Sequence, residues 1–372
     1  MIIKRFLSFS IALTFTVVLM SVSTAFGATA SFNDYPFLYK GLRSLGMGSA
    51  YTAVGRDAEA LFYNPATLYD MGFQLHILDP VAEIDSGVTD IAEEVLDAMD
   101  IDDDQERTDE LFNLIERNQG KPLHFRIAFF PHVAVKNIAV GVLGQGRTDI
   151  KLHSPLSSAG AVEFHGGYEY GPVAGFSMAL PVTGLRIGVG GKYIARSWFD
   201  ENFTVADIAA ESFDFEEKKT DKSDISFDLG LLYNLPVLES LSPQAGLSVL
   251  DITDLDFEDG GKVPQRINLG ISIRPKIPFI TSTTLALDYQ DIAKGYEQDD
   301  SLGKRLHFGA EVGLLRNHLM LRAGLNQGYS SFGAEVDLWL LKLSYANYQE
   351  EIGIYAGQDK DERQAVQLII GW

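Results

Sequence analysis

The chain has 372 residues, no Cys and a formal net charge of −21 at pH 7. Without Cys it cannot form disulfides, thiolate metal sites or a lipid-modified N-terminal Cys. The acidic charge argues against nucleic acid as a partner, because neutralising phosphates requires clustered Lys and Arg.

Residues 1–27 have the pattern of a secretory signal peptide. Lys4 and Arg5 give a positive start, residues 6–20 are mostly apolar, and small residues follow at Ala25 and Gly27. We predict cleavage after Gly27; an uncleaved N-terminal anchor fits less well because the apolar run is short. No later stretch of the sequence approaches the roughly 20 consecutive apolar residues of a membrane helix. The mature protein is therefore either soluble outside the cytoplasm or a membrane β-barrel.

Residues 28–72 lack strand-like alternation and are crowded with small residues. Such residues permit close backbone packing, as in a plug folded inside a narrow lumen. Asn64-Pro65 is a turn signal, because Pro fixes its own φ and restricts the residue before it. A motif of the form RxxGMGxAxxAxxxDAxAxxxNPAxL comprises Arg43, Gly46, Met47, Gly48, Ala50, Ala53, Asp57, Ala58, Ala60, Asn64, Pro65, Ala66 and Leu68.

This motif resembles the hatch of the FadL/TodX family of outer-membrane transporters and of the related PorV-like proteins. The resemblance implies that residues 28–72 form a hatch that plugs a barrel of about 14 strands. It also implies that Asn64 contacts a kinked third strand beside a gap in the barrel wall. The hatch and gate residues that it assigns are Gly46, Gly48, Asp57, Asn64, Pro65 and Ala66.

Residues 73–372 carry long stretches in which apolar and polar side chains alternate. In residues 266–274, for example, every second residue is Ile or Leu and the others are polar or Gly. The stretches are about nine residues or longer, as a tilted membrane crossing requires, whereas soluble strands average about five or six. Fourteen such stretches lie near residues 73–80, 123–135, 138–152, 162–180, 184–197, 223–235, 243–257, 265–275, 282–292, 304–315, 318–326, 330–338, 340–349 and 364–372.

The alternation predicts an all-β fold, a transmembrane antiparallel up-and-down β-barrel of about 14 strands over residues 73–372. Closure is required because no backbone amide may stay unpaired in hydrocarbon. Short and long connections alternate, and an even strand count places both barrel ends on the periplasmic side. In the acidic connection 81–122, apolar residues at helical spacing predict two amphipathic helices in the first extracellular loop. These helices are either a solvated cap or a rim that gathers apolar ligands.

Two features of the predicted strands bear on function. Gly141, Gly144 and Gly146 on the third strand permit a bend, and Pro172 on the fourth cannot donate to the ladder. They mark a candidate gap in the wall, with close aromatic packing as the alternative explanation for the glycines. Trp372 ends an alternating last strand and resembles the signal that the barrel-assembly machinery reads, although an ordinary closing strand would look the same.

The sequence carries no recognisable catalytic or metal-binding motif. The seven His residues show no metal-ligand spacing such as HxxxH, and the acidic run at Asp100–Asp104 lacks the Gly and Glu of a calcium loop. The glycine clusters lead into no helix, which excludes a nucleotide fingerprint, and no GxSxG elbow occurs. We therefore predict a protein that is not an enzyme and has no metal and no cofactor.

Charged residues of both signs fall on inward-facing positions of the predicted strands. They either compensate one another and fix the plug in the lumen, or form a selectivity lining as in a porin. They are Arg186, Lys192, Asp228, Asp288, Glu311, Arg322, Glu335 and Asp337.

The pattern as a whole favours a multi-pass protein of the Gram-negative outer membrane. The resemblance to the FadL/TodX family implies passive uptake of hydrophobic molecules such as long-chain fatty acids or hydrocarbons. The alternatives are a structural or secretion-partner role, as in PorV-like proteins, and a porin for polar solutes. The predicted partners are a hydrophobic small molecule, the lipid bilayer and the barrel-assembly machinery.

Overall fold

The structure is a computed structural model that describes residues 36–157, 160–209, 219–296, 301–353 and 355–372. The predicted signal peptide lies outside the described residues. No helix within these ranges is long and apolar enough to cross a membrane.

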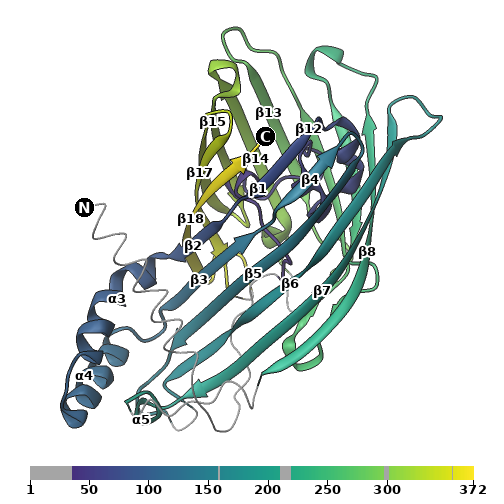
Figure 1. Ribbon diagram of the computed structural model, residues 1–372. Helices are drawn as coiled ribbons and strands as arrows, with labels where there is room; N and C mark the ends of the chain where they lie inside the picture. The colour runs from purple at the N-terminus through teal and green to yellow at the C-terminus, as the bar shows by residue number, and fades with distance from the viewer. Residues whose placement is uncertain (1–35, 158–159, 210–218, 297–300, 354) are drawn as a thin grey trace.

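The dominant feature is one antiparallel sheet that closes on itself (Figure 1). Its sixteen segments make a 14-stranded barrel, because two barrel strands are each divided in two. The first barrel strand consists of β1 and β2, and the second of β3 and β4. Both β1 and β2 pair with the last strand, β18, which completes the closure. The segments are β1 (Gln74–Leu78), β2 (Val81–Asp85), β3 (Pro122–Phe129), β4 (His132–Val135), β5 (Ile138–Leu152), β6 (Val162–Ala179), β7 (Leu185–Phe203), β8 (Thr220–Asn234), β9 (Gln244–Leu250), β12 (Arg266–Ile273), β13 (Ser282–Tyr289), β14 (Leu306–Leu314), β15 (Leu319–Asn326), β16 (Tyr329–Asp337), β17 (Leu341–Glu351) and β18 (Lys360–Gly371).

The strands turn apolar side chains outward at every second position. In β18, Val366, Leu368 and Ile370 are exposed, whereas Gln367 and Ile369 between them are buried. The same alternation recurs around the barrel, so a band of exposed apolar side chains surrounds a polar interior. An aqueous protein would hide such a band, whereas lipid solvates it. The prediction of a transmembrane β-barrel is confirmed.

The two ends of the barrel differ in their connections. At one end, here the short-turn end, strands join through tight turns such as Lys136-Asn137. At the other, the long-loop end, most connections are longer and some carry α-helices. A two-stranded hairpin of β10 (Leu255–Asp256) and β11 (Lys262–Val263) also lies in a long-loop connection. The helical segments are α2 (Leu42–Gly46), η1 (Ala58–Phe62), η2 (Pro65–Asp70), α3 (Ser86–Met99), α4 (Asp104–Arg117), α5 (Val205–Ala209), η3 (Glu239–Leu241), η4 (Glu258–Gly260), η5 (Leu302–Arg305) and η6 (Leu315–Asn317).

The first long connection forms the helices α3 and α4. Asp85 caps α3 by accepting a hydrogen bond from the backbone N–H of Val88, at 2.8 Å, and Asp103 caps α4 in the same way. Their apolar faces pack on the outer ends of neighbouring strands, where Leu114 belongs to one buried cluster with Phe164 and Phe199. The helices therefore sit beside the long-loop rim, together with α5 (Figure 1).

The first two barrel strands differ from their predicted bounds. The predicted first strand ends at Pro80, but the chain continues in β2 as far as Asp85. Pro80 interrupts the ladder without ending the barrel strand, since it lacks an N–H to donate. The acidic Glu83 and Asp85 hid this continuation from the sequence because both side chains are buried on the inner face.

Candidate functional site: the hatch in the barrel lumen

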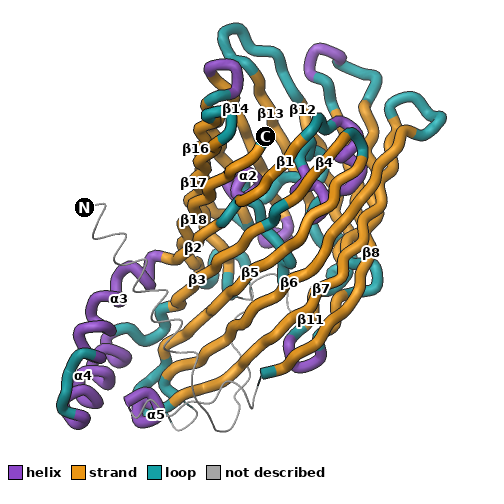
Figure 2. Tube along the Cα trace, viewed as in Figure 1, coloured by secondary structure: helices purple, strands orange, loops and turns teal. Residues whose placement is uncertain are grey.

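The N-terminal segment fills the lumen. We call its described part, residues 36–72, the hatch. Its helix α2 lies inside the ring of strands (Figure 2). Leu42, Met47 and Leu61 are among the most deeply buried side chains of the structure. Burial of these apolar side chains away from water stabilises the folded hatch.

A belt of glycines on the inner face of the barrel receives the hatch. A Cβ atom built on Gly230 would lie 2.0 Å from Oδ1 of Asn64, and one on Gly188 would lie 2.2 Å from the carbonyl carbon of Pro65. Real Cβ atoms do not approach so closely, so the hatch contacts the backbone of the wall. The belt takes one residue from each of eight strands, β6 to β9, β12 and β14 to β16: Gly175, Gly188, Gly230, Gly246, Gly270, Gly309, Gly324 and Gly333.

The Asn64-Pro65-Ala66 turn has a defined contact with the wall. Oδ1 of Asn64 accepts a hydrogen bond from the N–H of Ala66 at 3.0 Å and so caps η2. Its Nδ2 donates to the carbonyls of Thr52, at 2.8 Å, and Leu231, at 3.1 Å. Leu231 lies on β8, the sixth barrel strand. The prediction that Asn64 meets the third strand, β5, is therefore wrong; the belt glycines of β7 and β8 fix η2 there instead.

The Gly46-Met47-Gly48 turn makes a second backbone contact. Gly48 has a φ of 61°, and a Cβ on it would lie 2.5 Å from the carbonyl oxygen of Phe308. Both conditions exclude larger residues. A Cβ on Gly46 would lie 3.0 Å from Cα of Gly333 on β16. These two predicted hatch residues thus touch β14 to β16, four to six strands around the barrel from the β8 contact of Asn64.

Charged groups clamp the hatch to the wall. Arg43 forms a bidentate pair with Glu311 on β14, at 2.9 and 2.7 Å, and an ion pair with Asp57 at 2.8 Å. Glu311 and Glu335 are bridged in turn by Arg322, at 2.8 Å to each. Bidentate Arg–carboxylate pairs fix orientation as well as position. The inward charges singled out in the sequence therefore include a network that holds the hatch.

Two further carboxyl groups belong to this interface. Asp288 on β13 accepts hydrogen bonds from the backbone N–H groups of Tyr51, at 2.7 Å, and Thr52, at 2.8 Å. Within the hatch, burial and the nearby Asp57 carboxylate raise the pKa of Glu59 to about 8. Glu59 therefore titrates near neutral pH, at a point where the hatch faces the charged network.

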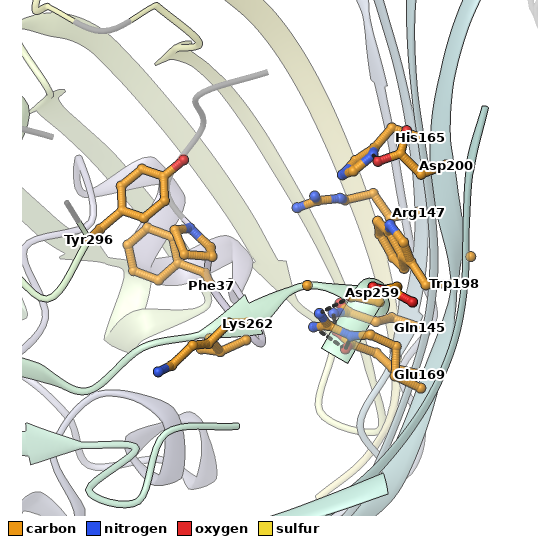
Figure 3. Close-up of a pocket in the computed structure, with 16 residues that line it drawn as sticks. Phe37, Gln145, Arg147, His165, Glu169, Trp198, Asp200, Asp259, Lys262 and Tyr296 are labelled. Atoms are coloured by element: carbon orange, nitrogen blue, oxygen red, sulfur yellow. Dashed lines mark hydrogen bonds and ion pairs between the residues drawn. The ribbon is translucent and has the colours of Figure 1, made fainter. Parts of the chain in front are cut away.

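Two separate cavities lie on either side of the hatch. One, of about 310 Å³, lies towards the long-loop end, where Phe37 and Tyr296 face Trp198 and Arg147 (Figure 3). Its other lining groups include both signs of charge, such as the pair between Arg196 and Glu169. The second, of about 280 Å³, lies towards the short-turn end and shares none of the first cavity's lining residues. Its lining includes Arg43, Asp57, Glu59, His76, Arg322 and Lys342.

The architecture is similar to solved channel structures. The chain matches a mutant of the TodX monoaromatic hydrocarbon channel (13% identity, 89% of this chain, 98% of that chain, TM-score 0.51). It also matches the CymD monoaromatic hydrocarbon channel (12%, 91%, 98%, 0.50) and a Pseudomonas aeruginosa FadL homologue (10%, 92%, 99%, 0.52). This chain has the FadL/TodX-type fold. No family model matches the sequence, and a search of curated proteins finds no match.

In this FadL/TodX-type barrel, β5 leaves no gap toward β6. The two strands pair at every position from Ile138 to Leu152. The ring of Phe130 occupies the space beside Gly141, and that of Phe129 the space beside Gly144. Aromatic packing, the alternative explanation, therefore accounts for these two glycines, whereas Gly146 has only an ordinary contact.

Pro172 does interrupt a ladder, but on the other edge of β6. The β6–β7 pairs run to Tyr170 opposite Ala195 and resume at Val173 opposite Lys192. The register is the same on both sides of the interruption, because Pro172 lacks an N–H but keeps the strand direction.

A larger break lies between the first two barrel strands. His76 pairs with His132 on one side of it, and Val81 with Ala128 on the other. Residues 77–80 therefore face residues 129–131 with one residue in excess, as in a bulge. Oδ1 of Asp79 accepts a hydrogen bond from the N–H of Phe130 at 2.7 Å, and the Phe130 ring packs on Phe62 of the hatch at 5.0 Å. The break is thus filled by side chains from the wall and the hatch.

His76 and His132 were missed as a pair in the sequence. They are far apart in the chain, with both helices of the first long connection between them. Only the register of the first two barrel strands places them opposite each other, and HxxxH-type spacing cannot reveal a cross-strand pair.

Trp372 closes the barrel through its backbone. Its N–H donates to the carbonyl of Leu75 at 2.7 Å, and its carbonyl accepts from the N–H of Leu75 at 2.8 Å. The indole is exposed and meets the Trp339 ring at 6.0 Å. Tryptophans at a membrane–water interface commonly take this position.

Proposed function

We propose that this protein is a passive outer-membrane channel that takes up hydrophobic molecules. The observation that carries the proposal is the hatch, held between two separate cavities of a closed barrel. Such an arrangement blocks free passage of water and ions but gives a ligand a binding site on the way in. The similar solved structures described as monoaromatic hydrocarbon channels support the same function.

The cavity toward the long-loop end suits a hydrophobe that also bears a polar group. Phe37, Trp198 and Tyr296 line it with aromatic rings, and cationic side chains such as Arg147 and Arg196 lie over the Trp198 ring (Figure 3). Apolar burial against the rings supplies affinity without an energy source, while the polar groups fix orientation. Passage to the second cavity then requires the hatch to move. Long-chain fatty acids have this chemistry, whereas a monoaromatic hydrocarbon would use the aromatic rings alone.

A porin for polar solutes is the second candidate. The lining of the same cavity favours it, because Arg147, Glu169, Arg196 and Asp200 all face the space. Charged linings of this kind set selectivity in open pores. The two functions differ in whether the hatch leaves a continuous aqueous path.

Planar bilayers and uptake assays separate the two. For the proposed channel we expect no steady ionic current from the wild-type protein, together with uptake of a labelled fatty acid or toluene by cells that lack their own hydrophobe channel. Trp198→Ala should reduce this uptake, and Trp339→Ala, at the exposed short-turn rim, is the matched control. A steady ohmic current without hydrophobe uptake would instead establish the porin. Mass spectrometry of molecules retained on the purified protein would identify the ligand class.

A further inference from the structure

We propose that His76, Asp79 and His132 form a binding site for a divalent transition-metal ion of the Zn²⁺ class, located at the break between the first two barrel strands. One ligand atom of each residue lies within 4.8 Å of the others. All three side chains are buried, with 8%, 2% and 5% of their surface exposed. The proposal is independent of what the channel carries.

The histidine on β4 is oriented as a metal ligand. Nδ1 of His132 lies 2.7 Å from the carbonyl oxygen of Phe130, so this nitrogen carries the proton and donates it. The lone pair of Nε2 is then free, and Nε2 has no hydrogen-bond partner among the described residues. Metal-binding histidines are commonly held in this way, with the second nitrogen bonded to a backbone carbonyl. A buried imidazole nitrogen without any partner otherwise costs stability.

Asp79 and His76 would supply the other two ligands of the site. Oδ1 of Asp79 is occupied by the N–H of Phe130, and Oδ2 faces Nδ1 of His76 at 3.4 Å. The two imidazole rings have their centroids 4.2 Å apart. The Phe130 backbone thus orients both Asp79 and His132. The amide N–H of Gln74 donates to Nε2 of His76 at 3.1 Å, so Nδ1 of His76 carries a proton towards Asp79, and a bound ion would take the place of this proton.

The donor set indicates the class of ion. Two imidazoles and one carboxylate suit Zn²⁺ or a similar ion, whereas Ca²⁺ and Mg²⁺ prefer sets made only of oxygen. Ligands at about 2.0–2.2 Å from a tetrahedral zinc lie roughly 3.4 Å from one another. His76 and Asp79 are already at this separation, 3.4 Å, so the remaining approach, at most about 1.4 Å, concerns His132, and side-chain rotation can cover it. Because His76 also lines the cavity of the short-turn end, an ion has an entry path and water has access to a fourth position.

The site would join the first two barrel strands at the edge of the break, next to the backbone pair of His76 and His132. His76 and Asp79 belong to the first barrel strand and its break, and His132 to the second. A bound ion would bridge them where the ladder is interrupted. Since Phe130 connects the same site to Phe62 of the hatch, metal binding would also stiffen the wall on which the hatch rests.

Cobalt is a suitable probe because Co²⁺ bound by imidazoles in a four-coordinate site absorbs visible light strongly, unlike Co²⁺ in an oxygen-only shell. We expect the full-length wild-type protein in detergent to bind one Co²⁺ with this spectrum, and Zn²⁺ to displace it. His132→Gln and Asp79→Asn should weaken binding by more than the 10- to 100-fold that loss of a second-shell partner typically costs. His318→Gln, an exposed histidine at the same end, is the matched control and should bind as the wild type does.

Two results would overturn the proposal: no imidazole-type Co²⁺ spectrum in the wild-type protein, or an undiminished spectrum in His132→Gln. Folding of each variant is checked by its heat-modifiable migration in gels. If a variant does not fold, the X-ray absorption spectrum of the Zn²⁺-loaded wild-type protein decides. A first shell with two imidazoles supports the site, and a shell of oxygen atoms alone refutes it.

Discussion

Asn64→Ala is the substitution that most directly tests whether the hatch is a movable gate. The side chain is fully buried and makes three hydrogen bonds, one within its own turn, one to Thr52 of the hatch and one to Leu231 of the wall. Removing it leaves the barrel strands untouched. We therefore expect the hatch to loosen while the barrel still inserts.

The magnitude follows from those three bonds. A net contribution of about 1 kcal/mol for each gives a loss of about 3 kcal/mol, which includes the helix cap of η2. Since about 1.4 kcal/mol corresponds to a tenfold change, local opening of the hatch should become about 100-fold more frequent. Barrel stability should change little. The wall loses only the hydrogen bond that the Leu231 carbonyl accepts from Asn64, and Leu231 stays in the ladder of β8 with β7 and β9.

Hydrogen exchange read by mass spectrometry measures this opening. Peptides covering residues 58–71 should exchange about 100-fold faster in Asn64→Ala, and hydrophobe uptake should change with them. Asn268→Ala is the control, because Asn268 is also buried, and within the described part of the chain its side chain bonds to Ser248 and Asp291 of the barrel and not to the hatch. Unchanged exchange in Asn64→Ala, or an equal increase in the control, would refute the reasoning.

Three further predictions concern the hatch and its barrel. Gly230→Ala should unseat the hatch and speed its exchange, since the added Cβ would meet Asn64, whereas Gly146→Ala, with its nearest contact at 3.7 Å, should have little effect. Burial raises the pKa of Glu59 to about 8, above its unfolded value near 4.5, so between these pH values the folded hatch keeps a proton that the unfolded chain loses. The stability of the hatch should therefore fall as pH rises from about 4.5 to 8. Glu59→Gln should remove that part of the pH dependence in thermal melts. Trp372→Ala should lower the yield of assembled barrel in cells without lowering the melting temperature of the protein that does assemble, because the indole is exposed; a lowered melting temperature would show a structural role instead.

The barrel could be predicted from the sequence because its cause is local. Lipid on one side and a polar lumen on the other impose a period of two on each strand, as β12 and β18 show. The register between strands is also local wherever a tight turn joins them. The predicted strand bounds are wrong where inward-facing acidic residues make a strand look like a polar loop, as in β2.

The contacts between the hatch and the wall could not be predicted from the sequence, for a different reason. The motif predicts a turn at Asn64, but its partner depends on how the hatch is oriented within the lumen, which no local pattern specifies. The glycine belt shows the difficulty. Each of its members is one Gly within a strand, and only the assembled barrel places them on one track. The metal site has the same origin, because strand register brings His76 to His132.

Two parts of the barrel wall, β6 to β16 and the three strands formed by β1 to β5, hold the hatch by different means. This difference bears on where the hatch can yield. From β6 to β16 the hatch lies directly against the glycine belt, and Glu311 and Asp288 of the same strands bind Arg43 and Tyr51 of the hatch, which leaves little room for displacement. From β1 to β5 the contacts run through side chains, with Tyr39 and Phe62 of the hatch packed on Phe130. Side chains change rotamer far more easily than backbones separate. A ligand that displaces the hatch therefore meets least resistance toward β1 to β5, where the strand ladder is already broken and where an ion held by His76, Asp79 and His132 would oppose the movement.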